Sequence, residues 1–140
     1  MEHSPPDLNQ VTLQEIFDYG VDFLRKQNAK SSIILTTRGE GGLLTPQEHY
    51  RYRTEQPDGR VFRCGAGCFL PDERYDSNME GWAVVNFRNR FFNYEPAGRK
   101  MELLQALQRK HDQYDIEEWE DQWKNVAKEF ELTYTTPNST

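Results

Sequence analysis

The chain has 140 residues, of which 36% are hydrophobic, 29% charged and 13% aromatic, and its net charge is −6. This length fits one domain, the aromatic content argues against a disordered chain, and no apolar run approaches the roughly 18 residues that cross a bilayer. The first ten residues have neither a basic nor an apolar region and two cysteines are too few for a disulfide scaffold, so we expect a soluble cytoplasmic domain without a secretory signal or membrane contact.

The net charge is concentrated in the last part of the chain. Residues 1–100 carry 13 Lys/Arg and 14 Asp/Glu, whereas residues 101–140 carry 4 and 9. Six carboxylates lie within ten residues: Asp112, Asp115, Glu117, Glu118, Glu120 and Asp121. Acids are favoured near a helix N-terminus, but such a cluster also suits a surface that meets a basic partner. Both interpretations stay open at this point.

The N-terminal part predicts a lead-in followed by a helix. Residues 1–11 hold two prolines and no apolar periodicity, so we expect them to be flexible. Thr12 and Glu15 then have the spacing of a capping box. Apolar residues follow at helical spacing: Leu13, Ile16, Phe17, Val21 and Leu24. This pattern predicts an amphipathic helix over residues 12–27.

Strand signals come next. Residues 33–35 are a short apolar run that predicts a strand, and the glycines and proline of residues 36–47 predict a loop or an insertion into a more compact fold. Residues 50–53 alternate tyrosine and arginine, residues 56–59 have turn chemistry, and residues 60–64 resume the strand pattern. These three segments predict a β-hairpin.

The rest of the domain is predicted to be a packed loop and two helices. Residues 64–81 are rich in small and turn-forming residues and predict one helical turn or a tight packed loop, whereas residues 82–92 fit no single class. Met101, Leu104, Leu107 and His111 share one stripe of a helix over residues 100–112. A second capping box, Asp115 with Glu118, starts a helix whose apolar residues are Ile116, Trp119, Trp123, Val126, Ala127 and Phe130.

Together these elements predict a small α+β fold, with three main helices, a short antiparallel hairpin and a packed central loop. We expect one globular domain over residues 12–132 and a polar tail over residues 133–140. The expected core is Phe17, Leu24, Phe69, Leu104, Leu107, Trp119, Trp123 and Phe130.

The two cysteines, Cys64 and Cys68, have three possible uses. A structural metal site would need two further ligands, and His49 and His111 are distant candidates. A nucleophilic cysteine would need a base such as His111 and a third group to orient that base. Free cysteine is also among the most buried residue types, so simple packing beside the neighbouring glycines is the favoured interpretation. We predict no metal and no firm catalytic residue.

His111 is the base that the cysteine mechanism would use. We expect the adjacent Asp112 to be unable to orient the ring, so the orienting acid would have to come from elsewhere. His111 also falls on the apolar stripe of its helix, where a histidine is more often a hydrogen-bonded core residue.

Charged and aromatic residues in the middle of the chain suggest binding. The carboxylates Asp72, Glu73, Asp76 and Glu80 lack the spacing of a calcium loop, and no phosphate loop or dinucleotide fingerprint is present, so we predict no cofactor. Arginines interleaved with aromatics, at residues 50–53 and 87–92, suit a nucleotide or a protein partner. The overall negative charge makes general nucleic-acid binding unfavourable. The candidate binding residues are Arg51, Arg53, Asp72, Tyr75, Glu80, Asp112, Glu117, Glu118 and Glu120.

Three segments, residues 12–30, 62–81 and 103–132, together resemble a family of small, mostly uncharacterised proteins of phages, prophages and some bacteria. The central match is Cys64, Gly67, Cys68, Pro71, Asp72, Tyr75, Met79, Glu80 and Gly81. It is flanked by Gln27, Lys30 and Ser31 on one side, and by Leu107, Gln108, His111, Asp112 and Trp119 on the other. Gly65 departs from the family pattern, where a larger residue is usual. The resemblance implies a phage-type accessory gene in the host cytoplasm but no activity.

Three functions follow as expectations. The first is non-enzymatic binding to a host or anti-phage defence protein, as an inhibitor. The second is binding of a nucleotide or small molecule, with the tyrosine and arginine strands as the site. The third is a cysteine-dependent hydrolase or transferase that uses Cys64 or Cys68 with His111. The small size, the acidic surface, the lack of a cofactor motif and the resemblance favour a protein that is not an enzyme, and the oligomeric state is left open.

Overall fold

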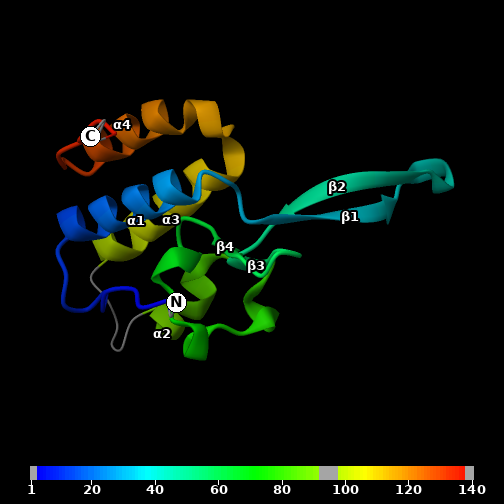
Figure 1. Cartoon of the computed structure of the whole chain (residues 1–140), viewed down its shortest axis with the longest axis horizontal. Coiled ribbons are helices and arrows are strands. Elements are labelled where there is room, and N and C mark those ends of the chain that lie inside the picture. Colours follow the sequence, from blue (N-terminus) through cyan, green and yellow to red (C-terminus); the bar gives the residue numbers. More distant parts are fainter. Residues whose placement is uncertain (1–2, 92–97, 138–140) are drawn as a thin grey trace.

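Three main helices, one short helix and two separate β-hairpins make up the fold, in a computed structural model that describes residues 3–91 and 98–137 (Figure 1). The helices are α1 (Leu13–Gln27), α3 (Gly98–Gln113) and α4 (Trp119–Glu129), with a short α2 (Arg88–Phe91). The hairpins are β1 (Ser32–Arg38) with β2 (Leu44–Tyr50), and β3 (Arg53–Glu55) with β4 (Val61–Arg63). The predicted α+β class is confirmed.

The three main helices form where the apolar periodicity placed them. Thr12 caps α1, and its side chain and that of Glu15 make the reciprocal bonds of a capping box. A 3-10 turn at Ile116–Glu118 leads into α4, and Asp115 caps that turn in the same way. Helix α3 contacts both α1 and α4, so it is the centre of the helical layer. All eight residues of the predicted core are buried, which confirms that prediction.

The central segment, residues 64–81, is the tight packed loop that its composition predicts. It contains 3-10 turns at Gly67–Phe69, Asp72–Arg74 and Ser77–Met79. Two glycines allow backbone to touch backbone: a Cβ at Gly65 would lie 2.3 Å from the carbonyl oxygen of Leu107, and one at Gly67 would lie 2.0 Å from that of Tyr52. The segment is therefore wedged between α3 and the chain that leads into β3.

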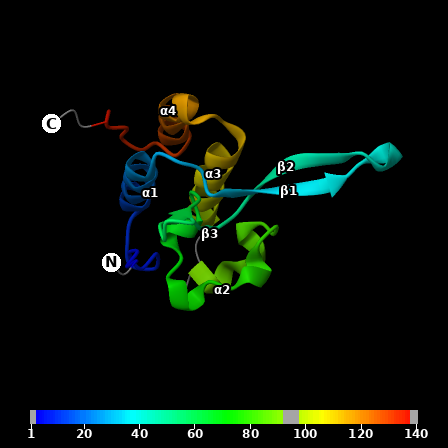
Figure 2. The ribbon, with the colours of Figure 1, turned by 45° about the vertical axis from the view of Figure 1, so that its right-hand side comes forward.

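Residues 32–50, the arm, form a long hairpin that projects from the rest of the molecule (Figures 1 and 2). The prediction of a loop over residues 36–47 is wrong, because the glycines are confined to the turn. Gly41 and Gly42 adopt φ angles of +77° and +78° there, while threonines continue the strands on both sides. The alternative prediction is an insertion into a more compact fold. It agrees with the position of the arm, which projects from the packed part of the molecule (Figure 1).

The second hairpin is shorter than predicted. The turn is present: the Gln56 N–H donates to the Arg60 carbonyl at 2.7 Å. The first strand begins only at Arg53, because Tyr50 still belongs to β2. Between the two hairpins the Glu80 carboxylate accepts the N–H of Tyr52 at 2.8 Å, which holds the chain outside either sheet.

Both ends of the described chain contact the helices. Leu8 is buried in the core, and Lys100 Nζ donates to its carbonyl at 2.8 Å. Near the other end, the side-chain amide of Gln14 donates to the Thr133 carbonyl and accepts the Thr133 N–H. The packed contacts thus reach beyond the predicted domain of residues 12–132, to Leu8 on one side and to Thr133 and Tyr134 on the other. No helix in the described part of the chain has both the length and the apolar character needed to cross a membrane.

Candidate functional site

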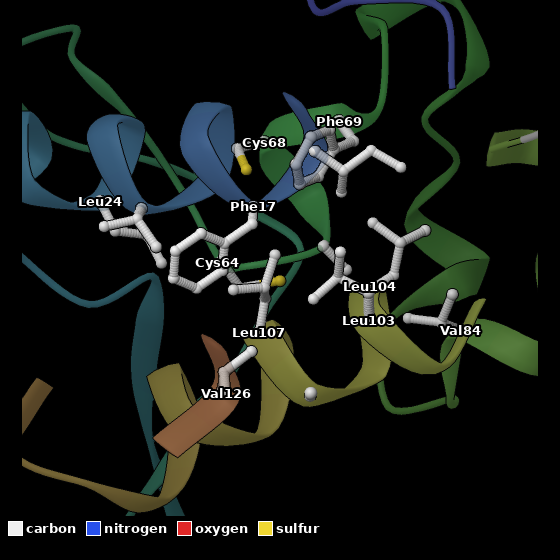
Figure 3. Close-up of a cluster of buried hydrophobic side chains, with 14 of the residues drawn as sticks. Phe17, Leu24, Cys64, Cys68, Phe69, Val84, Leu103, Leu104, Leu107 and Val126 are labelled. Carbon is white, nitrogen blue, oxygen red and sulfur yellow. The ribbon is translucent and has the colours of Figure 1, made fainter. Parts of the chain in front are cut away.

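Cys64 and Cys68 lie inside the core. Their exposed fractions are 1% and 0%, and their sulfur atoms are enclosed by side chains of α1, α3 and the central segment (Figure 3). The Gly67 N–H donates to the Cys64 sulfur at 3.2 Å. Burial raises the pKa of the Cys64 thiol to about 12 and that of Cys68 well above its usual value. Because attack requires the thiolate, these surroundings argue against a nucleophile and favour the packing interpretation.

His111 is fully buried, and both of its ring nitrogens are occupied. Nε2 accepts the Ser31 N–H at 3.0 Å, and Nδ1 lies 2.6 Å from the Asp112 carboxylate. Because Nε2 accepts, the proton is assigned to Nδ1, which donates to Asp112. The expectation that these adjacent residues could not pair is wrong, since both lie in the last turn of α3, where the Asp112 side chain folds back onto the ring.

This histidine connects α3 to the start of the arm. Its ring stacks on Trp119 with centroids 5.6 Å apart and meets Tyr50 edge-on at 6.1 Å. Neither nitrogen is free to take a proton from a thiol. In residues 3–91 and 98–137 no group of three or more His, Cys, Asp or Glu side chains is placed to hold a metal ion. His111 is thus a structural residue that fixes Ser31 at the base of the arm.

Four candidate binding residues come together beside the central segment. Asp72 accepts hydrogen bonds from Arg63 at 3.0 Å and from Arg53 at 3.3 Å. The Tyr75 hydroxyl donates to Glu80 at 2.7 Å. Burial raises the pKa of Asp72, but the guanidinium groups of Arg63 and Arg53 lower it by more than burial raises it. The pKa of Asp72 therefore lies below its usual value.

The role of this cluster is internal. Arg63 is buried, and Asp72 supplies the charge that it needs. Glu80 is occupied by backbone N–H groups as well as by Tyr75. The cluster therefore holds the central segment against β3 and β4, and its residues have little left to offer a ligand.

The acidic cluster divides into structural and free carboxylates. Glu120 accepts hydrogen bonds from Arg25 at 2.7 Å and from the Tyr134 hydroxyl at 2.6 Å, which ties α4 to α1. Burial raises the pKa of Glu120, but these bonds lower it overall. Glu118 is exposed and accepts the Asp115 N–H as part of the cap, whereas Glu117 faces solvent. Only part of the predicted acidic surface is thus available to a partner.

A small cleft brings together Arg51 and Asp112, candidates from two different clusters. The cleft has a volume of about 350 Å³ and lies between the base of the arm, the end of the central segment and α3. Trp82 lines it with 59% of its surface exposed. A cation, a carboxylate and an exposed aromatic ring in one cleft can bind a small polar molecule.

The arm carries four of the five large apolar side chains that are exposed among the described residues, and the fifth is Trp82 in the cleft. The exposed fractions are 63% for Ile34, 42% for Leu35, 69% for Leu43 and 59% for Leu44. None of the four is among the site residues predicted from the sequence. Apolar and β-branched residues lie on either side of the glycines, at residues 33–37 and 43–45. This pattern is typical of a β-hairpin and could have predicted this surface.

Comparison of this chain with protein-family models, with curated proteins and with solved structures gave no match. The resemblance to phage-encoded proteins therefore remains a prediction from the motifs alone.

Proposed function

We propose that this chain is a phage-encoded accessory protein that acts without catalysis, by binding a host or anti-phage defence protein through its arm. The single observation behind this proposal is the exposure of four large apolar side chains on a hairpin that projects from the body. Isolated exposed hydrophobics are ordinary, but a group of them on one projecting element is typical of an interaction surface.

The energetics support a protein partner. Full burial of one Leu or Ile side chain stabilises a complex by about 1.5–3 kcal/mol. Leu43 and Leu44 are adjacent at the turn and more than half exposed, so a partner with an apolar groove gains from covering both. The arm also offers exposed charges, Arg38 and Glu40, at the rim of this apolar tip, as interfaces usually do.

The chemistry of the body points the same way. The two thiols are buried, and His111 bonds through both ring nitrogens, so neither cysteine has a free histidine base beside it. The class of partner, a host or defence protein, rests on the resemblance to phage-encoded proteins rather than on any contact in the structure.

Affinity purification from the bacterial host tests the proposal. Tagged wild-type protein should retain a stoichiometric partner, and the double variant Leu43→Ser, Leu44→Ser should lose it while keeping its circular dichroism spectrum. The matched control, Glu117→Lys with Asp121→Lys, changes two exposed residues on the acidic side and should retain the partner. If only the control variant loses the partner, the binding site lies on the acidic side instead of the arm. If the wild-type protein retains no stoichiometric partner, the proposal is overturned.

The cleft favours a second candidate function, binding of a nucleotide or small molecule. Trp82 can stack on a planar base, and Arg51 can reach a phosphate, although Asp112 and Glu48 in the same cleft oppose an anion. A thermal-shift screen with nucleotides, including cyclic dinucleotides, tests it. A hit that disappears with Trp82→Ala supports the cleft, and a screen without hits counts against it.

A further inference from the structure

The two strands of the arm differ in how their outer edges present backbone N–H and C=O groups to another strand. The Arg51 N–H donates to Ser31 at one end of the hairpin, and the Gly39 N–H donates to Leu43 at the other. In an antiparallel pair, hydrogen-bonded and non-hydrogen-bonded pairs alternate, so odd-numbered residues of β1 bond to β2. The even-numbered residues of β1 therefore direct their N–H and C=O groups to its outer edge: Ser32, Ile34, Thr36 and Arg38.

The outer edge of β2 is protected. Pro46 lies opposite Thr36 in a non-hydrogen-bonded pair, so the position of its missing N–H faces outward. Another strand could not form a continuous ladder along this edge. Proline on an edge strand is a common protection against unwanted pairing.

The outer edge of β1 has no such protection. Residues 32–38, Ser-Ile-Ile-Leu-Thr-Thr-Arg, contain no proline or glycine and only one charge, which lies at the far end. Within the part of the chain that the structure describes, the outward N–H and C=O groups of Ile34 and Thr36 have no hydrogen-bond partner. A seven-residue edge without proline, glycine or an internal charge is a template for another strand.

We propose that β1 of a second copy of this chain occupies this edge, antiparallel and across a two-fold axis. The result is one four-stranded sheet in the order β2, β1, β1 of the second copy, β2 of the second copy. Full overlap of residues 32–38 places Ser32 opposite Arg38 and Ile34 opposite Thr36. All of these residues direct their backbone groups outward, so each of these pairs exchanges two hydrogen bonds.

The side chains are self-complementary in this register. Leu35 lies on the two-fold axis and meets the same leucine of the second copy in a non-hydrogen-bonded pair, where side chains are closest. The two Arg38 residues lie at opposite ends of the new ladder, whereas parallel pairing would place them side by side. Arg38 of one copy lies opposite Ser32 of the other, whose hydroxyl donates to Glu48 at 2.7 Å, so opposite charges approach each other.

Edge pairing leaves both faces of the sheet and the turn open. Leu43 and Leu44 thus stay available to a partner, and the dimer presents them twice. The inference is independent of the proposed function, because purified protein should dimerise without any partner present.

The oligomeric state of the purified full-length chain is the first test. Light scattering after size exclusion should give a dimer at about 100 μM. Thr36→Pro should give a monomer, because it removes an outward N–H that the hairpin itself does not use. The matched Thr36→Ala retains this N–H and should remain dimeric. A monomeric wild type, or a dimer that Thr36→Pro leaves intact, would overturn the inference.

Disulfide trapping is the second test, and it does not depend on how well Thr36→Pro folds. A cysteine at position 35 would face its copy at about 4.5 Å between Cα atoms, within the range of a disulfide. Leu35→Cys should therefore cross-link rapidly under mild oxidation, while the native cysteines stay buried. The control is Gln47→Cys, opposite residue 35 on β2 and three strand spacings, about 14 Å, from its copy. Equal cross-linking of both variants, or of neither, would contradict the pairing.

Discussion

The body of the molecule and its arm use similar residues in opposite ways. In the body, potentially reactive side chains are buried and hydrogen-bonded. The thiols pack in the core, and His111 forms hydrogen bonds through both ring nitrogens. In the arm, apolar side chains that would normally form a core face solvent. Residue type alone therefore does not locate a site in this fold, whereas solvent exposure separates the structural groups from those available to a partner.

The largest expected effect lies in the body, at Gly67. A Cβ there would lie 2.0 Å from the Tyr52 carbonyl oxygen, so Gly67→Ala has to displace backbone. We expect a loss of roughly 3 kcal/mol or more in the free energy of unfolding, measured by urea denaturation. Gly41→Ala in the turn of the arm is the control: a Cβ meets nothing within 4 Å, and the positive φ should cost only about 1 kcal/mol. Equal losses of unfolding free energy in the two variants would contradict the distinction between the body and the arm.

The next effect is expected at the connection between body and arm. His111→Ala leaves the buried Ser31 N–H without an acceptor and opens a cavity beside Trp119, and we expect a loss of about 2–3 kcal/mol in the free energy of unfolding. His111→Gln provides an oxygen near the position of Nε2 and should recover part of this loss. If glutamine recovers nothing, the hydrogen bond to Ser31 contributes little and the ring acts only through packing.

Most of the body was predictable because local signals and tertiary packing agree there. The capping boxes at Thr12 and Asp115 and the apolar stripe of α3 place the helices within a few residues. The packed loop followed from glycines and a proline, although its backbone contact with Leu107 did not, since close approach depends on residues far apart in the sequence.

The arm and the site were predicted less well. Glycines between two strand signals indicate either a loop or a turn, and only the register that pairs Thr36 with Pro46 decides between them. The candidate binding residues were selected by charge, but Asp72 and Glu120 are paired with arginines from elsewhere in the chain. Long-range pairing of this kind is not visible in a single sequence.

A smaller effect is expected from the ion pairs of the body, and it depends on pH. Because the pKa of Asp72 is lowered in the folded state, its ionised form stabilises the fold above its unfolded pKa, and this contribution is lost as the pH falls through the folded value. Asp72→Asn should therefore lower the melting temperature at about pH 7, and this difference should shrink progressively as the pH falls below the unfolded pKa of about 4. Asp121→Asn, which changes an exposed carboxylate, should leave the melting temperature unchanged across the same pH range. An Asp72→Asn effect that persists at low pH would indicate a packing role rather than a charge role.

The smallest effect on stability should come from the largest deletion, which removes the arm. Ile33 and His49 form a hydrogen-bonded pair, so replacing residues 34–48 by Asn-Gly closes the hairpin with a two-residue turn. Because Ile34, Leu35 and Leu44 are exposed, their loss removes little buried surface, and we expect the free energy of unfolding to change by less than about 1 kcal/mol. Urea denaturation of the shortened chain measures this change.

The same deletion should abolish both the dimer and the capture of a partner, whereas Thr36→Pro should abolish the dimer and leave Leu43 and Leu44 in place. Comparing these two variants separates the edge of the arm from its tip. A shortened chain that stays folded but still dimerises would place the dimer contact in the body. A shortened chain that loses several kcal/mol would show that the body needs the arm, and the contrast between an enclosed body and an exposed arm would then be wrong.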